Sequence, residues 1–103
     1  ARRMAEAPPF GRYAAIIISS EKLDEATVTA RMIGRTSPAT EGMHVYGPAP
    51  APLAMLRGRH RQRLLVHARR SLDVQQVIRD WLGPLTWPRG VRVAVDVDPY
   101  SFL

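Results

Sequence analysis

One stretch near the start of the chain, residues 12–19 (RYAAIIIS), constrains the fold most. It is short, becomes β-branched toward its end, and lies between Gly11 and a pair of serines, a pattern typical of a β-strand. Because side chains alternate between the two faces of a strand, residues 14, 16 and 18 face one way and residues 13, 15 and 17 the other. Both sets are apolar, so we predict a central strand with something covering each of its faces.

A helix is predicted directly after this strand. Ser20 is the expected N-cap, and three carboxylates follow within five residues, where the helix dipole favours negative charge. Gly34 and then the Ser37-Pro38 pair end the pattern. The apolar positions recur at helical spacing and form one stripe: Leu23, Ala26, Ala30 and Ile33.

A second amphipathic helix is predicted in the last third of the chain. Ser71 or Asp73 is its expected N-cap, and Asp73 with Gln76 makes a pair typical of a capping box. The Gly83-Pro84 pair ends it. Its apolar stripe consists of Val74, Val77, Ile78 and Trp81, and Trp81 is expected in the core.

Three further strands are predicted, at residues 43–46, at about 59–68 and at 91–98. In the last of these the odd-numbered valines share one face. Between the first two, residues 47–52 (GPAPAP) contain three prolines that cannot donate a backbone hydrogen bond. We therefore predict a stiff extended connector there, close to polyproline II, outside any strand.

The resulting order is strand-helix-strand-strand-helix-strand, which predicts the α+β class. The ferredoxin-like βαββαβ arrangement fits best: a four-stranded antiparallel sheet with two helices on one face and the other face open. The 103 residues are enough for one such domain. We expect an extended N-terminal arm at residues 1–11, a single domain at 12–103 with an apolar tail after residue 99, and a fragment of a longer protein, since the chain begins without Met.

The charge pattern points to an anionic partner. The chain has fifteen Lys and Arg against nine Asp and Glu, and residues 57–70 (RGRHRQRLLVHARR) contain six arginines and no acid. On a strand, Leu64, Val66 and Ala68 would face the helices while Arg59, Arg61, Arg63 and His67 face outward. Arginines two residues apart lie roughly 6.5–7 Å from each other, close to the phosphate spacing of a nucleic-acid strand. The alternative is a solvated basic strand paired with Asp96 and Asp98.

Other kinds of chemistry find little support. There is no cysteine, no Walker loop and no metal-ligand spacing among His44, His60 and His67, so we expect no catalytic residue, metal or cofactor in this chain. Asp96 and Asp98 lack a nearby Glu or His and are expected to pair with arginine. The outward positions that carry aromatic rings in RNA-recognition domains are arginines here, which favours contact with phosphates over contact with bases.

Three short motifs together resemble one family. They are residues 7–12 (APPFGR), the proline tract 47–52 followed by Gly58-Arg59, and residues 96–99 (DVDP). In this order and spacing they resemble the C-terminal domain of the primosomal protein N′ (PriA) family of bacterial replication-restart helicases. Many relatives carry aromatic residues where His60 and Gln62 stand, so that edge is not expected to stack bases.

The resemblance implies a function. The full-length family members are ATP-dependent 3′-to-5′ DNA helicases of the bacterial cytoplasm that recognise abandoned forks and begin primosome assembly. Their ATP and zinc sites lie in other domains, and this domain is similar in fold to a small-subunit ribosomal protein and helps to bind branched DNA. The family also binds the acidic tail of the single-stranded-DNA-binding protein, and Arg70 and Gln75 fall in the matching region.

The leading hypothesis is a non-catalytic module that binds forked or branched DNA through its phosphates. One rival is a docking module whose open face, lined by Tyr13, Ala15 and Ile17, packs on other domains of the helicase. Another is an RNA-binding domain of the ribosomal type. The residues expected to contact DNA are Arg57, Arg59, Arg61, Arg63, Arg69 and Arg70.

Overall fold

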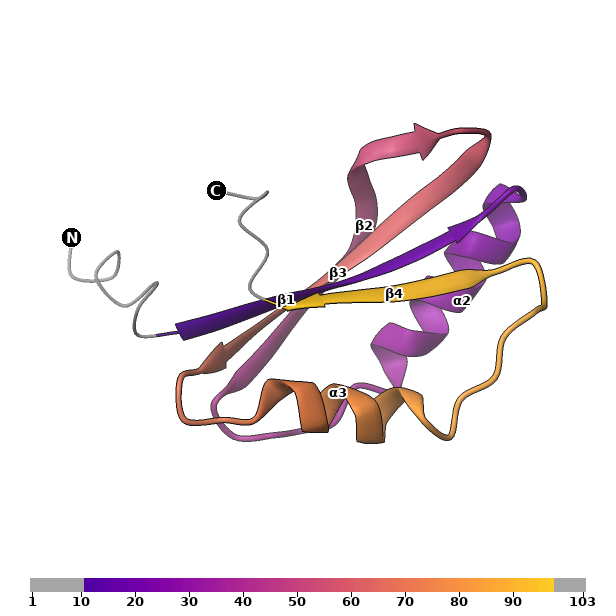
Figure 1. Ribbon diagram of the computed structural model, residues 1–103. Coiled ribbons are helices and arrows are strands. Elements are labelled where there is room, and N and C mark those ends of the chain that lie inside the picture. Colours follow the sequence, from indigo (N-terminus) through magenta and orange to yellow (C-terminus); the bar gives the residue numbers. More distant parts are fainter. Residues whose placement is uncertain (1–10, 98–103) are drawn as a thin grey trace.

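The computed structural model describes residues 11–97 and has the predicted ferredoxin-like arrangement (Figure 1). Two helices lie on one side of a four-stranded sheet whose order is β2-β3-β1-β4, with every neighbouring pair antiparallel. The elements follow the predicted order: β1 (Gly11–Ser20), α2 (Leu23–Arg35), β2 (Met43–Leu56), β3 (Arg59–Arg69), α3 (Val74–Leu82) and β4 (Arg92–Val97).

β1 is a central strand, as its two apolar faces predict, with β3 on one side and β4 on the other. It begins at Gly11, which pairs with Arg69 of β3. Gly11 was expected to be the last residue of the N-terminal arm and instead belongs to the sheet. Residues 1–10, Asp98 and the apolar tail lie outside the described residues. Within residues 11–97, no helix is long and apolar enough to cross a membrane.

The core lies between the sheet and the two helices. The even-numbered side chains of β1 and β3 face this side, and those from Ala14 to Ser20 and from Leu64 to Ala68 are buried; the odd-numbered valines of β4 face the same side. Trp81 is buried as expected, and its indole Nε1 donates to the Ile33 carbonyl and to Thr36 Oγ1, both at 3.1 Å. These bonds attach α3 to the C-terminal end of α2.

The prediction for β2 was wrong in extent. The strand is 14 residues long, and the proline tract lies inside it, with Ala49 opposite Arg63 and Pro50 opposite Gln62. A strand at the edge of a sheet needs partners on one side only, so prolines whose missing N–H would point outward are tolerated. The register shifts twice along the tract. At the first shift Gly47 has φ +107, and a Cβ there would lie 2.8 Å from the Arg63 carbonyl oxygen.

The prediction that Ser20 caps the first helix was also wrong. Ser20 ends β1 and is buried, and α2 begins three residues later, at Leu23, with Lys22 as its N-cap and no side-chain cap. Ser20 Oγ accepts from the Lys22 backbone N–H at 3.1 Å and donates to Glu25 Oε1 at 2.9 Å. Its hydroxyl closes the strand-to-helix turn instead of the first helical turn.

For the second helix, Asp73 is the N-cap. Its side chain accepts from the Gln76 backbone N–H at 3.2 Å, as the capping pair predicts. The Gln76 side chain does not complete the box: its Oε1 accepts from Arg79 Nη2 at 3.2 Å and its Nε2 donates to Asp80 Oδ1 at 2.9 Å, both along the helix.

Candidate nucleic-acid interface

The open face of the sheet carries the outward arginines of β3. Residues directly opposite each other in antiparallel strands share a face, so the pairings of three strands define rows across it. In one row Arg61 is opposite Ser19, and Ser19 is in turn opposite Arg92 of β4. In the next row Arg63 and Ala94 flank Ile17. The predicted division of β3 into a helix-facing set and an outward set is therefore confirmed.

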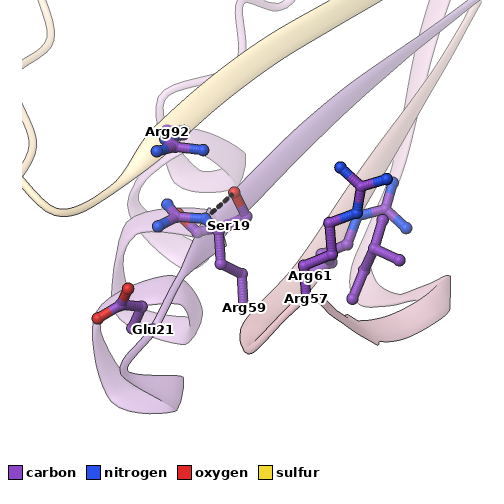
Figure 2. Close-up of a pocket in the computed structure, with 7 residues that line it drawn as sticks. Ser19, Glu21, Arg57, Arg59, Arg61 and Arg92 are labelled. Carbon is purple, nitrogen blue, oxygen red and sulfur yellow. Dashed lines mark hydrogen bonds between the residues drawn. The ribbon is translucent and has the colours of Figure 1, made fainter.

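The row with two arginines borders a hollow of about 390 Å³ at the end of the open face (Figure 2). Figure 2 shows Arg59 and Arg92 beside Ser19, with Arg57 and Arg61 extending from the β2–β3 hairpin. Four arginines and one acidic residue, Glu21, line it. We call this hollow the arginine pocket; it is lined by Ser19, Glu21, Leu56, Arg57, Arg59, Arg61 and Arg92.

Neutral acceptors hold two of these guanidinium groups in place. Arg59 Nε donates to Ser19 Oγ at 3.2 Å, and Nη2 donates to the carbonyls of Ser19 at 2.9 Å and Gly90 at 3.0 Å. Arg61 Nη1 donates to the Leu53 carbonyl at 3.0 Å. These bonds orient the side chains without adding a negative charge, so the positive charge of both guanidinium groups is positioned but not neutralised.

Arg57 reaches the pocket from a tight turn. It and Gly58 are the two residues between β2 and β3, with φ values of 53 and 78. Positive φ at both central residues is the pattern of a type I′ hairpin turn, which favours Asn, Asp or Gly. A left-handed conformation costs a side chain such as arginine about 1–2 kcal/mol. A large basic residue at this position therefore points to a role other than stability.

The six arginines expected to contact DNA do not form one cluster. Arg57, Arg59 and Arg61 line the arginine pocket, and Arg63 lies in the next row. Arg69 is at the other end of β3, ten residues or about 33 Å from Arg59 along the strand. Arg70 follows directly after the strand. The structure thus brings four of the six to one end of the open face.

Two residues that line the arginine pocket were not predicted from the sequence. Arg92 and Ser19 come from β4 and β1, far in sequence from the arginine run. The signal for Arg92 was present, because the odd-numbered valines of β4 face the helices and the residue between two of them must face outward. Its position beside Arg61 depends on register, which the local pattern does not contain.

Tyr13 and His67 lie on the open face as predicted, whereas their stacking and the His44 and Tyr46 rings on the same face were not predicted. Tyr13 and His67 are directly opposite each other, and their rings stack with centroids 4.5 Å apart and planes 9° apart. His44 of β2 is opposite His67 on its other side, and its ring centroid lies 6.4 Å from that of Tyr46. These rings lie toward the end of the sheet opposite the arginine pocket.

Gln75 and Arg70, the two residues expected to bind a partner peptide, do not line a common groove. Gln75 borders an apolar groove of about 480 Å³ between α3 and the edge strand β4, on the helix side of the sheet. Arg70 does not line it, whereas Arg79 does. Val95 in the groove is 42% exposed, so apolar surface is open there. The complete lining is Gln75, Ile78, Arg79, Leu82, Gly83, Val95 and Val97.

The acidic side chains near the end of the chain contribute no metal site in the part that the structure describes. No group of three or more His, Cys, Asp or Glu side chains in residues 11–97 is placed to hold a metal ion. Asp96 is exposed and opposite Ala15 on the open face, and its expected companion Asp98 lies outside the described residues.

Comparison with known proteins identifies the family of the chain. The primosomal protein N C-terminal domain family matches residues 3–100. The chain belongs to this family. Its relatives include the replication restart protein PriA of Rickettsia felis, 30% identical over 98% of this chain, and that of Treponema pallidum, 34% identical over 93%. The chain spans 15% of the length of either relative.

Proposed function

We propose that this chain is a non-catalytic nucleic-acid-binding domain that acts in replication restart and holds branched DNA by its phosphates. The arginine pocket carries the proposal: four guanidinium groups from two strands and a turn converge on one hollow. Guanidinium groups bind phosphate oxygens in bidentate fashion, and such contacts give affinity with no dependence on base sequence. Family relatives named for replication restart support DNA over RNA as the ligand.

The same proposal assigns roles to the remaining arginines. Arg63 continues the path from the pocket along β3, and Arg69 and Arg70 would contact phosphates at the far end. We further propose that the parent protein is a cytoplasmic bacterial helicase whose ATP and zinc sites belong to its other domains. This domain would then contribute DNA contacts and no chemistry.

The test is a titration of the 103-residue chain into labelled forked DNA, duplex DNA and forked RNA of equal length. Replacing Arg61 and Arg92 by glutamine should weaken fork binding at least about tenfold, because each contributes a charge-assisted bond to phosphate. The control variant replaces Arg31 and Arg35, two exposed arginines on α2, and removes the same charge. It should bind forks nearly as tightly as the unmodified chain.

Other outcomes would favour the rivals. Tighter binding to RNA than to forked DNA would support the ribosomal-type function. Unchanged fork affinity after charge reversal at Arg61, with loss of assembly after Ile17→Asp, would support docking of the open face on another domain. Equal losses in the two double variants would mean that net charge, and not the pocket, determines affinity.

A second function is favoured by the groove beside α3. Its apolar lining next to the Arg79 guanidinium suits a short peptide that carries an apolar side chain near a carboxylate. We propose the acidic tail of the single-stranded-DNA-binding protein as its ligand, with Gln75 and Arg79 in contact and with no role for Arg70, which does not line the groove. Arg79→Glu should abolish binding of a labelled tail peptide while fork binding persists. Unchanged peptide binding would remove the groove from this role.

A further inference from the structure

Four ring side chains gather on the open face away from the arginine pocket. We call them the ring row: His44 and Tyr46 from β2, Tyr13 from β1 and His67 from β3. Tyr46 is 55% exposed and His44 is exposed. Large rings left open to solvent on a sheet face commonly mark a binding surface.

The backbone beneath the ring row leaves space for the His67 ring. The His67 imidazole lies over Gly11, and a Cβ at Gly11 would collide with His67 Nε2. Only glycine therefore leaves room for the near-parallel stack of His67 on Tyr13. The stack fixes two of the four rings before any ligand arrives, which reduces the ordering cost of binding.

We propose that the ring row stacks unpaired nucleobases, so that the open face binds a single-stranded segment of nucleic acid. Base stacking on aromatic side chains is tolerant of sequence, because every base presents a flat π face. The proposal deepens the proposed function and rests on it, since the arginines supply the phosphate contacts. The bases would contact rings at positions other than the arginine positions 59, 61 and 63.

The spacing of charges and rings along β3 suits an extended strand. Arg61 and His67 are six residues apart, about 20 Å along the strand, with Arg63 between them on the same face. Arg69 follows His67 on that face and is exposed. Arginines thus flank the ring row at both ends, which matches a strand whose phosphates run past stacked bases.

The surface between the two ends is apolar over β2, β3 and β1. Leu65 is opposite Tyr46 on one side and Ala15 on the other, so an apolar floor joins the ring row to the Arg63 row, and the one charge in this row is Asp96 at its β4 end. Duplex DNA presents its bases edge-on within the grooves and could not use such a floor. Flat exposed rings with adjacent arginines therefore favour single-stranded over duplex nucleic acid as the occupant.

The test uses two oligonucleotides with the same number of phosphates, a thymidine strand and an abasic strand. The 103-residue chain should bind the thymidine strand about tenfold more tightly than the abasic strand at one salt concentration. Changing His44 and Tyr46 to alanine should lower this ratio to near one and leave abasic binding unchanged. Tyr46→Trp should preserve the ratio. Val28→Ala is the control, since Val28 is an equally exposed apolar residue, 60% exposed on α2.

The outcomes separate the two proposals. If both strands bind with equal affinity, the phosphates account for all of the binding and the ring row has no role, while the proposed function stands. If neither strand binds and forked DNA does not bind either, the proposed function fails and the inference fails with it. If the alanine variant retains the full ratio, the bases contact some other surface and the inference is wrong.

Discussion

The two faces of the four-stranded sheet differ in the polarity and burial of their side chains. On the helix-covered face, the middle of β1 and the second half of β3 present apolar and buried residues, such as Ile16 and Leu64. On the open face the neighbouring positions carry arginines at one end and rings at the other. Because adjacent residues of a strand face opposite ways, stability and binding can be assigned to alternate residues of one segment. β3 therefore contributes to the core through one face, while its other face carries residues that we propose bind nucleic acid.

The largest effect should separate two neighbours on β1. Ile16 is fully buried on the covered face, whereas Ile17 lies on the open face between Arg63 and Ala94. Ile16→Asp should cost about 3–5 kcal/mol of unfolding free energy, because it buries an unpaired charge. Ile17→Asp should cost less than about 1 kcal/mol, since it meets an arginine and solvent. Urea denaturation of the two variants measures both, and equal losses would contradict the division of faces.

A smaller effect should distinguish two arginines of the open face. Arg59 donates three hydrogen bonds that join β3 to the end of β1 and to Gly90, whereas Arg61 donates one, to an exposed carbonyl. Arg59→Ala should therefore lower the unfolding free energy by about 1–2 kcal/mol, and Arg61→Ala by less than about 0.5 kcal/mol. Thermal unfolding followed by circular dichroism distinguishes them. Equal unfolding free energies of the two variants would mean that the Arg59 hydrogen bonds do not stabilise the fold.

The smallest effect should have opposite signs in stability and binding. Arg57 occupies a left-handed position of a type I′ turn, where asparagine is favoured. Arg57→Asn should raise the unfolding free energy by about 0.5–1 kcal/mol and weaken fork binding several-fold. Denaturation and fork titration of the same preparation test it. A variant that is stabilised but binds unchanged would exclude Arg57 from the interface.

Much of the fold could be predicted from the sequence, because it depends on local periodicity. The alternation of Leu64, Val66 and Ala68 with outward residues identified both faces of β3, and Asp73 identified the start of α3. The proline tract was misassigned because proline excludes a hydrogen bond on one side only, and the sequence alone does not show which strand lies at an edge.

Less of the candidate site than of the fold could be predicted from the sequence. The position of Arg92 beside Ser19 and Arg61, and the stack of Tyr13 on His67, depend on the register between strands far apart in the chain. Register results from the packing of the whole sheet, so no local pattern contains it. The arginine run indicated the kind of ligand, whereas the pairing of strands determines where those arginines meet.

The most direct test of the central claim is the salt dependence of fork binding. If the arginine pocket and its neighbours neutralise three or four phosphates, log K should fall with log salt at a slope of about −3. Replacing Arg61 and Arg92 by glutamine should flatten that slope by about 2, while replacing Arg31 and Arg35 on α2 should leave it unchanged. An equal slope in the unmodified chain and both variants would contradict the account, because the pocket would then contact no phosphate.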